Sequence, residues 1–216
     1  MALAEGMIFS ETKGVLFDLD GTLIDSTPAI TRSWSAVLNE IGISLDVLPS
    51  LHGSPSKQSL RRLLPESDEK EINHWAKKIE DLEVEDTEGI ILLPGARELF
   101  QFLNEHSIEW FIVTSCTRDL GTSRANSVGL TLPPKSVFFD DVVKGKPHPD
   151  PYLLGVERLG LSADKVLVLE DAPAGIKSGK AAGIKVIAMQ TTHSKDSLRE
   201  ADHIADSLLE IPNLLR

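Results

Sequence analysis

Short runs of apolar residues recur along the chain, and the segments between them show helical spacing. Each run is a short apolar stretch rather than an amphipathic helix, which is typical of a buried parallel strand. Because helical patterns separate the runs, we expect the α/β fold class, with a Rossmann-like parallel sheet. The predicted strands are VLFDL (15–19), WFIVTS (110–115), SVFFD (136–140), KVLVLED (165–171) and KVIAM (185–189).

The pattern changes between Thr22 and Leu93, where helical spacing replaces the apolar runs. Ser26 or Thr27 can cap a first helix that has Pro28 in its first turn. The three helices of this segment are predicted up to Gly42, over 57–64 and over 67–82, the last of them very acidic. Further helices are predicted around 96–103, 117–127, 149–159 and 172–182.

This change of pattern predicts two units within the 216 residues. We expect residues 1–21 and 94–216 to form an α/β catalytic core and residues 22–93 to form a helical cap inserted after the first strand. The hinges are expected near 20–23 and 92–95. With one full-length core, a monomer is the default expectation.

Charge and cysteine content restrict the class of function. The 33 acidic and 22 basic side chains give a net charge of −11, which disfavours a nucleic-acid groove that must neutralise phosphates. A single cysteine, Cys116, excludes an internal disulfide and a thiolate zinc site, as expected in a reducing compartment. No basic leader and no run of eighteen apolar residues is present, so we expect a cytoplasmic protein without a membrane partner.

Polar side chains stand at the ends of the predicted strands. In open α/β sheets, ligands bind beyond the carboxyl ends of the strands, so these residues are expected to meet at one edge. They are Asp18 and Asp20, Thr114 and Ser115, Glu170 and Asp171, with Lys146 in the loop after the strand ending near Phe139.

Such crowded carboxylates cannot all stay ionised without a cation, and their hard oxygen atoms suit Mg²⁺. With Mg²⁺ bound, Asp18 can keep a nucleophilic oxygen at neutral pH and accept a phosphoryl group. Asp20 can then protonate the leaving alcohol and later take a proton from water. Countercharge from Lys146, a hydroxyl group from Ser115 and backbone amides complete what phosphoryl transfer requires.

Four motifs resemble those of the haloacid-dehalogenase-like hydrolases in order and spacing. They are FDLDGTLID, FIVTS, KGKPHPDPY and LEDAPAGIKSGKAAG. The resemblance covers nearly the whole chain and includes a cap at the same place. It implies that Asp18 is the nucleophile and Asp20 the acid and base, with the backbone carbonyl of Asp20 facing the metal. It also implies phosphate binding by Ser115 and Lys146 and metal binding by Asp171, together with Glu170.

Within that family, VTSCTRD, KPHPDPY and EDAPAGIKSGKAAG look most like the fungal-type phosphatases of glycerol phosphate and 2-deoxyglucose 6-phosphate. The resemblance therefore implies a phosphatase of a small phosphorylated sugar or polyol. Those enzymes usually carry an arginine shortly after the HG pair, where this chain has Ser54 and Pro55. This departure leaves the substrate open. His52 and Lys57 are candidate substrate contacts.

Several assignments have alternatives. Thr114 competes with Ser115 for the phosphate, and Lys144 competes with Lys146. Glu170 is either a metal ligand or a structural hydrogen-bond partner. Cys116 is expected to contribute a backbone amide to the phosphate site rather than a nucleophilic thiol.

Two other functions would use similar residues. A sugar phosphomutase returns the phosphoryl group to its substrate, and it needs a cationic cap residue such as Lys57 for the second phosphate. A receiver-like signalling module also uses clustered aspartates and Mg²⁺, but it carries no helical insertion after its first strand.

Overall fold

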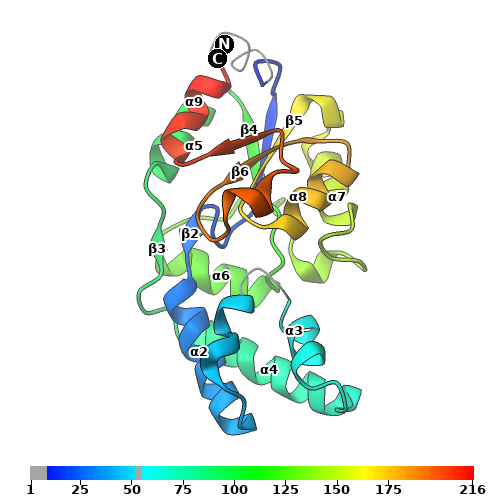
Figure 1. Ribbon diagram of the computed structural model, residues 1–216. Helices are drawn as coiled ribbons and strands as arrows, with labels where there is room; N and C mark the ends of the chain where they lie inside the picture. Colours follow the sequence, from blue (N-terminus) through cyan, green and yellow to red (C-terminus); the bar gives the residue numbers. More distant parts are fainter. Residues whose placement is uncertain (1–8, 52–54) are drawn as a thin grey trace.

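A computed structural model describes residues 9–51 and 55–216. Five parallel strands form a central sheet in the order β4-β1-β5-β6-β7 (Figure 1). Val15 of β1 lies opposite Trp110 of β4 on one side and Leu167 of β5 on the other. The sheet confirms the expected α/β fold class. Its strands are β1 Gly14–Phe17, β4 Glu109–Ile112, β5 Val166–Glu170, β6 Lys185–Met189 and β7 His203–Ala205.

Helices cover both faces of this sheet (Figure 1). Because successive strand residues point to opposite faces, β1 contributes to two hydrophobic clusters. Val15 packs in one cluster with Leu99 of α5, and Leu16 packs in the other with Tyr152 of α7 and Ile176 of α8. The core helices are α5 Ala96–Glu105, α6 Arg118–Ser127, α7 Asp150–Leu159, α8 Pro173–Ala181 and α9 Ile211–Leu214.

One predicted strand is wrong. Residues 136–140 contribute only a single bridge, Val113 to Val137, and the chain then turns into the short 3₁₀ helix Phe139–Asp141. The physical reason is local, since a carboxylate oxygen of Asp141 accepts a hydrogen bond from the backbone N–H of Phe138 at 3.1 Å. This contact stabilises a turn where the apolar run alone predicted extended backbone. β7, by contrast, was not predicted.

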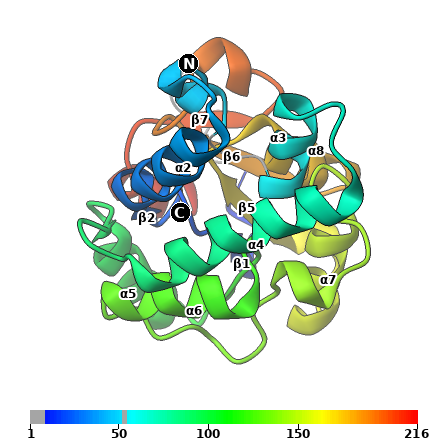
Figure 2. The same ribbon diagram turned by 90° about the horizontal axis from the view of Figure 1, so that it is seen from below.

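A separate group of helices follows β1 and has its own hydrophobic cluster, in which Trp34 and Leu38 pack against Leu60, Ile72 and Ile79. We call this group, from α2 to α4, the helical insert. Figure 2 shows α2 and α4 lying in front of the strands when the molecule is viewed from this side. The insert comprises α2 Thr27–Ile41, the 3₁₀ helix Leu45–Ser50, α3 Ser56–Leu63 and α4 Glu69–Glu85.

Local signals set the ends of the insert helices. α2 ends at Gly42, which has a φ of 83° and donates its N–H to the carbonyl of Leu38. α4 begins after Asp68, whose side chain accepts a hydrogen bond from the N–H of Glu71. Two short antiparallel strands, β2 Ile24–Asp25 and β3 Ile91–Leu92, form the connections between insert and sheet.

Three further 3₁₀ helices complete the described structure: Ala163–Lys165, Lys195–Leu198 and Leu208–Glu210. Within residues 9–51 and 55–216, no helix has both the length and the apolar character that crossing a bilayer requires.

Candidate active site

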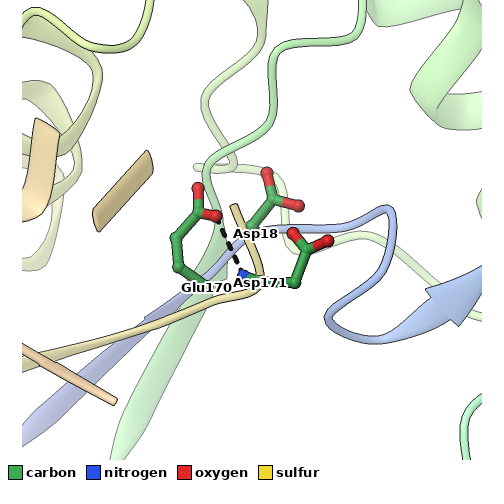
Figure 3. A group of neighbouring side chains, drawn as sticks. All are labelled: Asp18, Glu170 and Asp171. Atoms are coloured by element: carbon green, nitrogen blue, oxygen red, sulfur yellow. Dashed lines mark hydrogen bonds between the residues drawn. The ribbon is translucent and has the colours of Figure 1, made fainter. Parts of the chain in front are cut away.

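Three acidic side chains meet at the carboxyl ends of β1 and β5 (Figure 3). Asp18 directly follows β1, Glu170 is the last residue of β5 and Asp171 comes next. All three are buried, and each offers a carboxylate oxygen within 4.8 Å of the others. The sheet thus brings Asp18 together with Glu170 and Asp171, which lie more than a hundred positions later in the chain. The sequence predicted this meeting at the strand ends.

Lys146 supplies the positive charge of this cluster. Its Nζ atom lies 2.6 Å from Oδ1 of Asp18 and 2.6 Å from Oε1 of Glu170, and it also donates to the carbonyl of Val113 at 2.9 Å. Burial lowers the pKa of Lys146, but the two carboxylates outweigh that effect and raise the pKa well above its usual value. Lys146 is therefore a fixed cation, whereas its competitor Lys144 is exposed.

Glu170 uses both of its carboxylate oxygens within the protein. Oε1 accepts from Lys146 and from the hydroxyl group of Tyr152 at 3.0 Å, and Oε2 accepts from the N–H groups of Asp171 and Ala172. A Cβ at Gly175 would lie 1.6 Å from Oε1, so α8 can pass this carboxylate only with a glycine there. These contacts favour the hydrogen-bonding role of Glu170 over metal ligation.

Asp171 lies in a crowded acidic environment. Burial, followed by the charge of Glu170, raises the pKa of Asp171 to about 8, although the hydroxyl group of Thr192 donates to it and opposes that rise. Burial also raises the pKa of Asp18, and Lys146 only partly offsets it. The single positive charge of Lys146 therefore does not fully offset the burial and mutual repulsion of the three carboxyl groups.

The donor set fits a hard divalent cation. Asp18 and Asp171 offer oxygen atoms, and among the described residues Lys146 is the cation bonded to this cluster. Gly21 borders the same space, and a Cβ there would lie 2.1 Å from Oδ2 of Asp171. A cation of the Mg²⁺ type, which prefers few carboxylates and keeps water ligands, matches this arrangement.

Asp20 has a different environment from the acidic cluster. Its Oδ1 accepts a hydrogen bond from Ser26 at 2.6 Å, and its Oδ2 accepts from Arg124 at 2.7 Å and from the thiol of Cys116 at 3.0 Å. Neighbouring groups thus hold the Asp20 side chain at both of its carboxylate oxygens. Its backbone carbonyl as a metal ligand stays a prediction.

The loop after β4 separates the two candidate hydroxyl groups. Both residues line the cavity described below, but Thr114 is buried and its Oγ1 accepts the N–H of Cys116 at 3.1 Å, whereas Ser115 is exposed. This placement favours Ser115 as the phosphate ligand. The same hydrogen bond already engages the Cys116 amide that was expected to contact the phosphate. That contact also stays a prediction.

A cavity of about 540 Å³ lies between the strand ends and the helical insert. Asp18, Asp20, Ser115, Lys146 and Asp171 line it from the sheet side. The insert contributes a mixed wall that includes Ile30, Trp34, Leu51, Lys57, Asn73 and Glu80. Lys57 therefore borders the cavity, and its contact with a substrate stays a prediction. His52 lies outside the described residues.

Sequence patterns did not indicate every residue of the site. Tyr152 belongs to the motif KPHPDPY, so its position near Lys146 carried a signal. Arg124 and Thr192 lie in polar stretches that no motif marks. Glu83 belongs to an acidic helix in which nothing distinguishes it from its neighbours.

A parallel α/β sheet, a buried acidic cluster at its strand ends and a helical insert after the first strand together match the arrangement expected of the haloacid-dehalogenase-like hydrolases. A sequence profile of the family described as haloacid dehalogenase-like hydrolase matches residues 15–189, and the chain belongs to this family. The expected family resemblance is thereby confirmed.

Named relatives place the chain more closely within the family. It is 42% identical over 200 residues to hexitol phosphatase A of Escherichia coli, covering 92% of this chain and 93% of the relative. It is 36% identical over 211 residues to glycerol-1-phosphate phosphohydrolase 2 of Saccharomyces cerevisiae, covering 93% and 83%. A solved hydrolase of family IA, variant 3, from Entamoeba histolytica superposes with a TM-score of 0.84 at 28% identity, covering 94% and 98%.

Proposed function

We propose that the protein is a Mg²⁺-dependent phosphatase that hydrolyses a small phosphorylated sugar or polyol through an aspartyl-phosphate intermediate. The observation that carries the proposal is the meeting of Asp18, Lys146 and Asp171 at the floor of one cavity. The names of the two relatives, a hexitol phosphatase and a glycerol-1-phosphate phosphohydrolase, support the substrate class.

In the first step, an oxygen of Asp18 attacks phosphorus and the bond between phosphorus and the alcohol oxygen breaks. Asp20 gives its proton to that oxygen, so the alcohol leaves neutral. Lys146 lies 2.6 Å from Asp18 and can stabilise the oxygens of the transferring group, together with the hydroxyl group of Ser115. Asp18 and Asp171 would hold Mg²⁺, which would supply further positive charge to the phosphoryl group.

In the second step, Asp20 takes a proton from water, and the water oxygen attacks phosphorus. The bond between phosphorus and Asp18 breaks, which releases inorganic phosphate and restores the carboxylate. Asp20 thus ends the cycle protonated, as it began.

The cavity supports a small substrate. Its volume of about 540 Å³ lies within the range of small-molecule sites, and its insert wall offers both apolar and hydrogen-bonding side chains. We infer that residues 22–93 act as a cap, with hinges near 20–23 and 92–95, because the insert has its own hydrophobic cluster. Such a cap would exclude bulk water during the reaction.

Lys57 is the proposed substrate contact of the cap, since it lines the cavity on α3. Lys57→Met should raise KM by roughly tenfold and leave kcat within a few-fold, because the lysine contacts the part of the substrate that does not react. Arg61→Met, on the same helix but paired with Glu69 outside the cavity, is the control. An unchanged KM for Lys57→Met would remove Lys57 from the substrate site.

The direct test is a screen of hexitol, hexose and glycerol phosphates with Mg²⁺, in which released phosphate is measured. We expect turnover of at least one of these esters by the wild-type protein and none by Asp18→Asn, because the amide lacks the attacking oxygen. Formation of an isomeric phosphate without phosphate release would instead identify a phosphomutase. Equal turnover by Asp18→Asn would overturn the assignment of the nucleophile.

A further inference from the structure

Arg124 is a buried arginine on α6 that bonds to groups from three parts of the chain. Its Nη1 donates to Oδ2 of Asp20 at 2.7 Å and to the sulfur of Cys116 at 3.3 Å, and its Nη2 donates to Oε2 of Glu83 at 3.0 Å. Only 3% of the residue is exposed, and it lines the same cavity as Asp20.

The two carboxylates that Arg124 bridges come from different parts of the fold. Asp20 follows the first strand of the sheet, whereas Glu83 lies on α4 of the helical insert. A guanidinium group taken out of water costs several kcal/mol unless it is well paired. The position of Arg124 therefore depends on both partners, and α4 must lie against α6 for the second pairing to exist.

Neighbouring contacts hold α4 and α6 together at this point. Ser123, next to Arg124, donates its hydroxyl group to the carbonyl of Val84 at 2.7 Å. Thr117, just before α6, donates its hydroxyl group to Glu80. The insert is thus joined to the core along one helix, beside the residue proposed as the acid and base.

These contacts restrict the side chain of Asp20 at both oxygens. Ser26 holds Oδ1, and Arg124 holds Oδ2. A proton donor must lie within hydrogen-bond reach of the leaving oxygen, so a fixed orientation of this carboxyl group is a condition for efficient proton transfer.

We propose that Arg124 is a positioning residue that orients the Asp20 carboxyl group toward the leaving alcohol and links this orientation to the contact of α4 with the core. The proposal rests on the proposed phosphatase function. The proton that reaches the alcohol comes from Asp20 as the phosphorus–oxygen bond breaks. Arg124 stays protonated and forms no bond to the substrate.

The test compares two substrates that differ in their need for a proton. One is an alkyl phosphate that the wild-type protein hydrolyses in the screen, and the other is p-nitrophenyl phosphate, whose leaving group departs as an anion. The ratio kcat/KM reports the steps up to loss of the alcohol, so it is sensitive to the positioning of the acid. The variants are Arg124→Met and Arg124→Lys.

For Arg124→Met, we expect kcat/KM to fall about 100-fold on the alkyl ester and less than about fivefold on the aryl ester, since general acid catalysis contributes roughly 10² or more. Arg124→Lys keeps the charge but cannot bridge both carboxylates in the same geometry. Its loss on the alkyl ester should be intermediate and should again exceed its loss on the aryl ester. The lysine variant also serves as the test if the methionine variant does not fold.

Arg158→Met is the matched control, because Arg158 pairs with Asp141 at 3.2 Å and lies outside the cavity lining. Arg158→Met should change kcat/KM by the same factor for both esters. Equal losses on the two esters for the Arg124 variants, or activity within twofold of wild type, would overturn the proposal. A wild-type protein that hydrolyses neither ester would instead refute the phosphatase function, and the proposal with it.

Discussion

At the scale of single residues, the space around the acidic cluster restricts what the backbone can carry. Gly21 has a φ of 79°, and a Cβ on it would lie 2.1 Å from Oδ2 of Asp171. Gly42 at the end of α2 has a similar φ of 83°, but, apart from the adjoining backbone, no atom of the described residues lies within 4 Å of its Cβ position. The two glycines share a backbone conformation and differ in their surroundings, so they form a natural pair for comparison.

Gly42→Ala should lose roughly 1–2 kcal/mol of stability, because an L side chain is strained at positive φ. Gly21→Ala should lose at least as much, because its methyl group also clashes with Asp171. Only Gly21→Ala should also lose catalytic activity, by more than about tenfold, since its methyl group displaces the proposed metal ligand Asp171. Urea unfolding and phosphate release measure the two effects. Full activity of Gly21→Ala would show that Asp171 can move without consequence.

The charged residues of the acidic cluster could be predicted from the sequence. Asp18, Lys146 and Asp171 follow apolar runs or stand in recognisable motifs, and strands must deliver their ends to one edge of a parallel sheet. The bridge from Asp20 through Arg124 to Glu83 was not predictable, because its members are separated by up to 104 positions and no strand end marks two of them. Such contacts depend on how α4 packs against α6.

At the scale of elements, the contact between α4 and α6 decides how the helical insert meets the core. At this contact the buried Glu83 of α4 pairs with Arg124 of α6. Burial raises the pKa of Glu83 from 4.5 to about 7, and the positive charge of Arg124 offsets only part of that rise. Because the folded-state pKa lies above the unfolded value, the folded protein binds more protons between these two values of pH.

The sign of the pH dependence follows from this difference. The stability contribution of Glu83 is fully present below pH 4.5 and is lost as the pH rises through about 7. From pH 5 to pH 8, the free energy of unfolding of the wild-type protein should therefore fall by roughly 1–3 kcal/mol more than that of Glu83→Gln. Urea unfolding at both pH values measures the difference.

Glu85→Gln, on the exposed face of the same helix, controls for the removal of one acidic side chain. A constant stability difference between wild type and Glu83→Gln across this pH range would contradict the burial of a titrating carboxyl group between α4 and α6.

The prediction of a strand over 136–140 was wrong because a local hydrogen bond outweighed the apolar pattern. An apolar run favours extended backbone, but the hydrogen bond from the Phe138 N–H to Asp141 turns the chain after one bridge. β7, with only three residues, lacks a run long enough to be read. The α/β class was predictable because the buried strands β1 and β5 are continuous apolar runs. The short elements at its edges depend on tertiary pairing.

At the scale of the whole molecule, separate hydrophobic clusters in the sheet and the insert enclose one cavity, and a buried acidic site lies where they meet. The mutual repulsion of these carboxylates opposes folding, so a bound divalent cation should stabilise the folded state.

At a Mg²⁺ concentration of about 100 times its Kd, the free energy of unfolding should rise by about 2.7 kcal/mol. This gain should disappear with EDTA. Thermal unfolding with and without Mg²⁺ measures it. Asp171→Asn should abolish the gain, whereas Asp196→Asn, an exposed acid outside the site, should retain it. A gain that persists in Asp171→Asn would place the metal elsewhere.

The central claim is that Asp18 carries the phosphoryl group during turnover, and trapping that group tests it most directly. The protein is mixed with a substrate ester and Mg²⁺, quenched in acid within the first turnovers, and digested for peptide mass spectrometry. We predict a phosphorylated peptide whose modified residue is Asp18, absent from Asp18→Asn and lost when turnover is complete. Phosphate release without modification of Asp18, or with the phosphoryl group on another residue, would contradict the account.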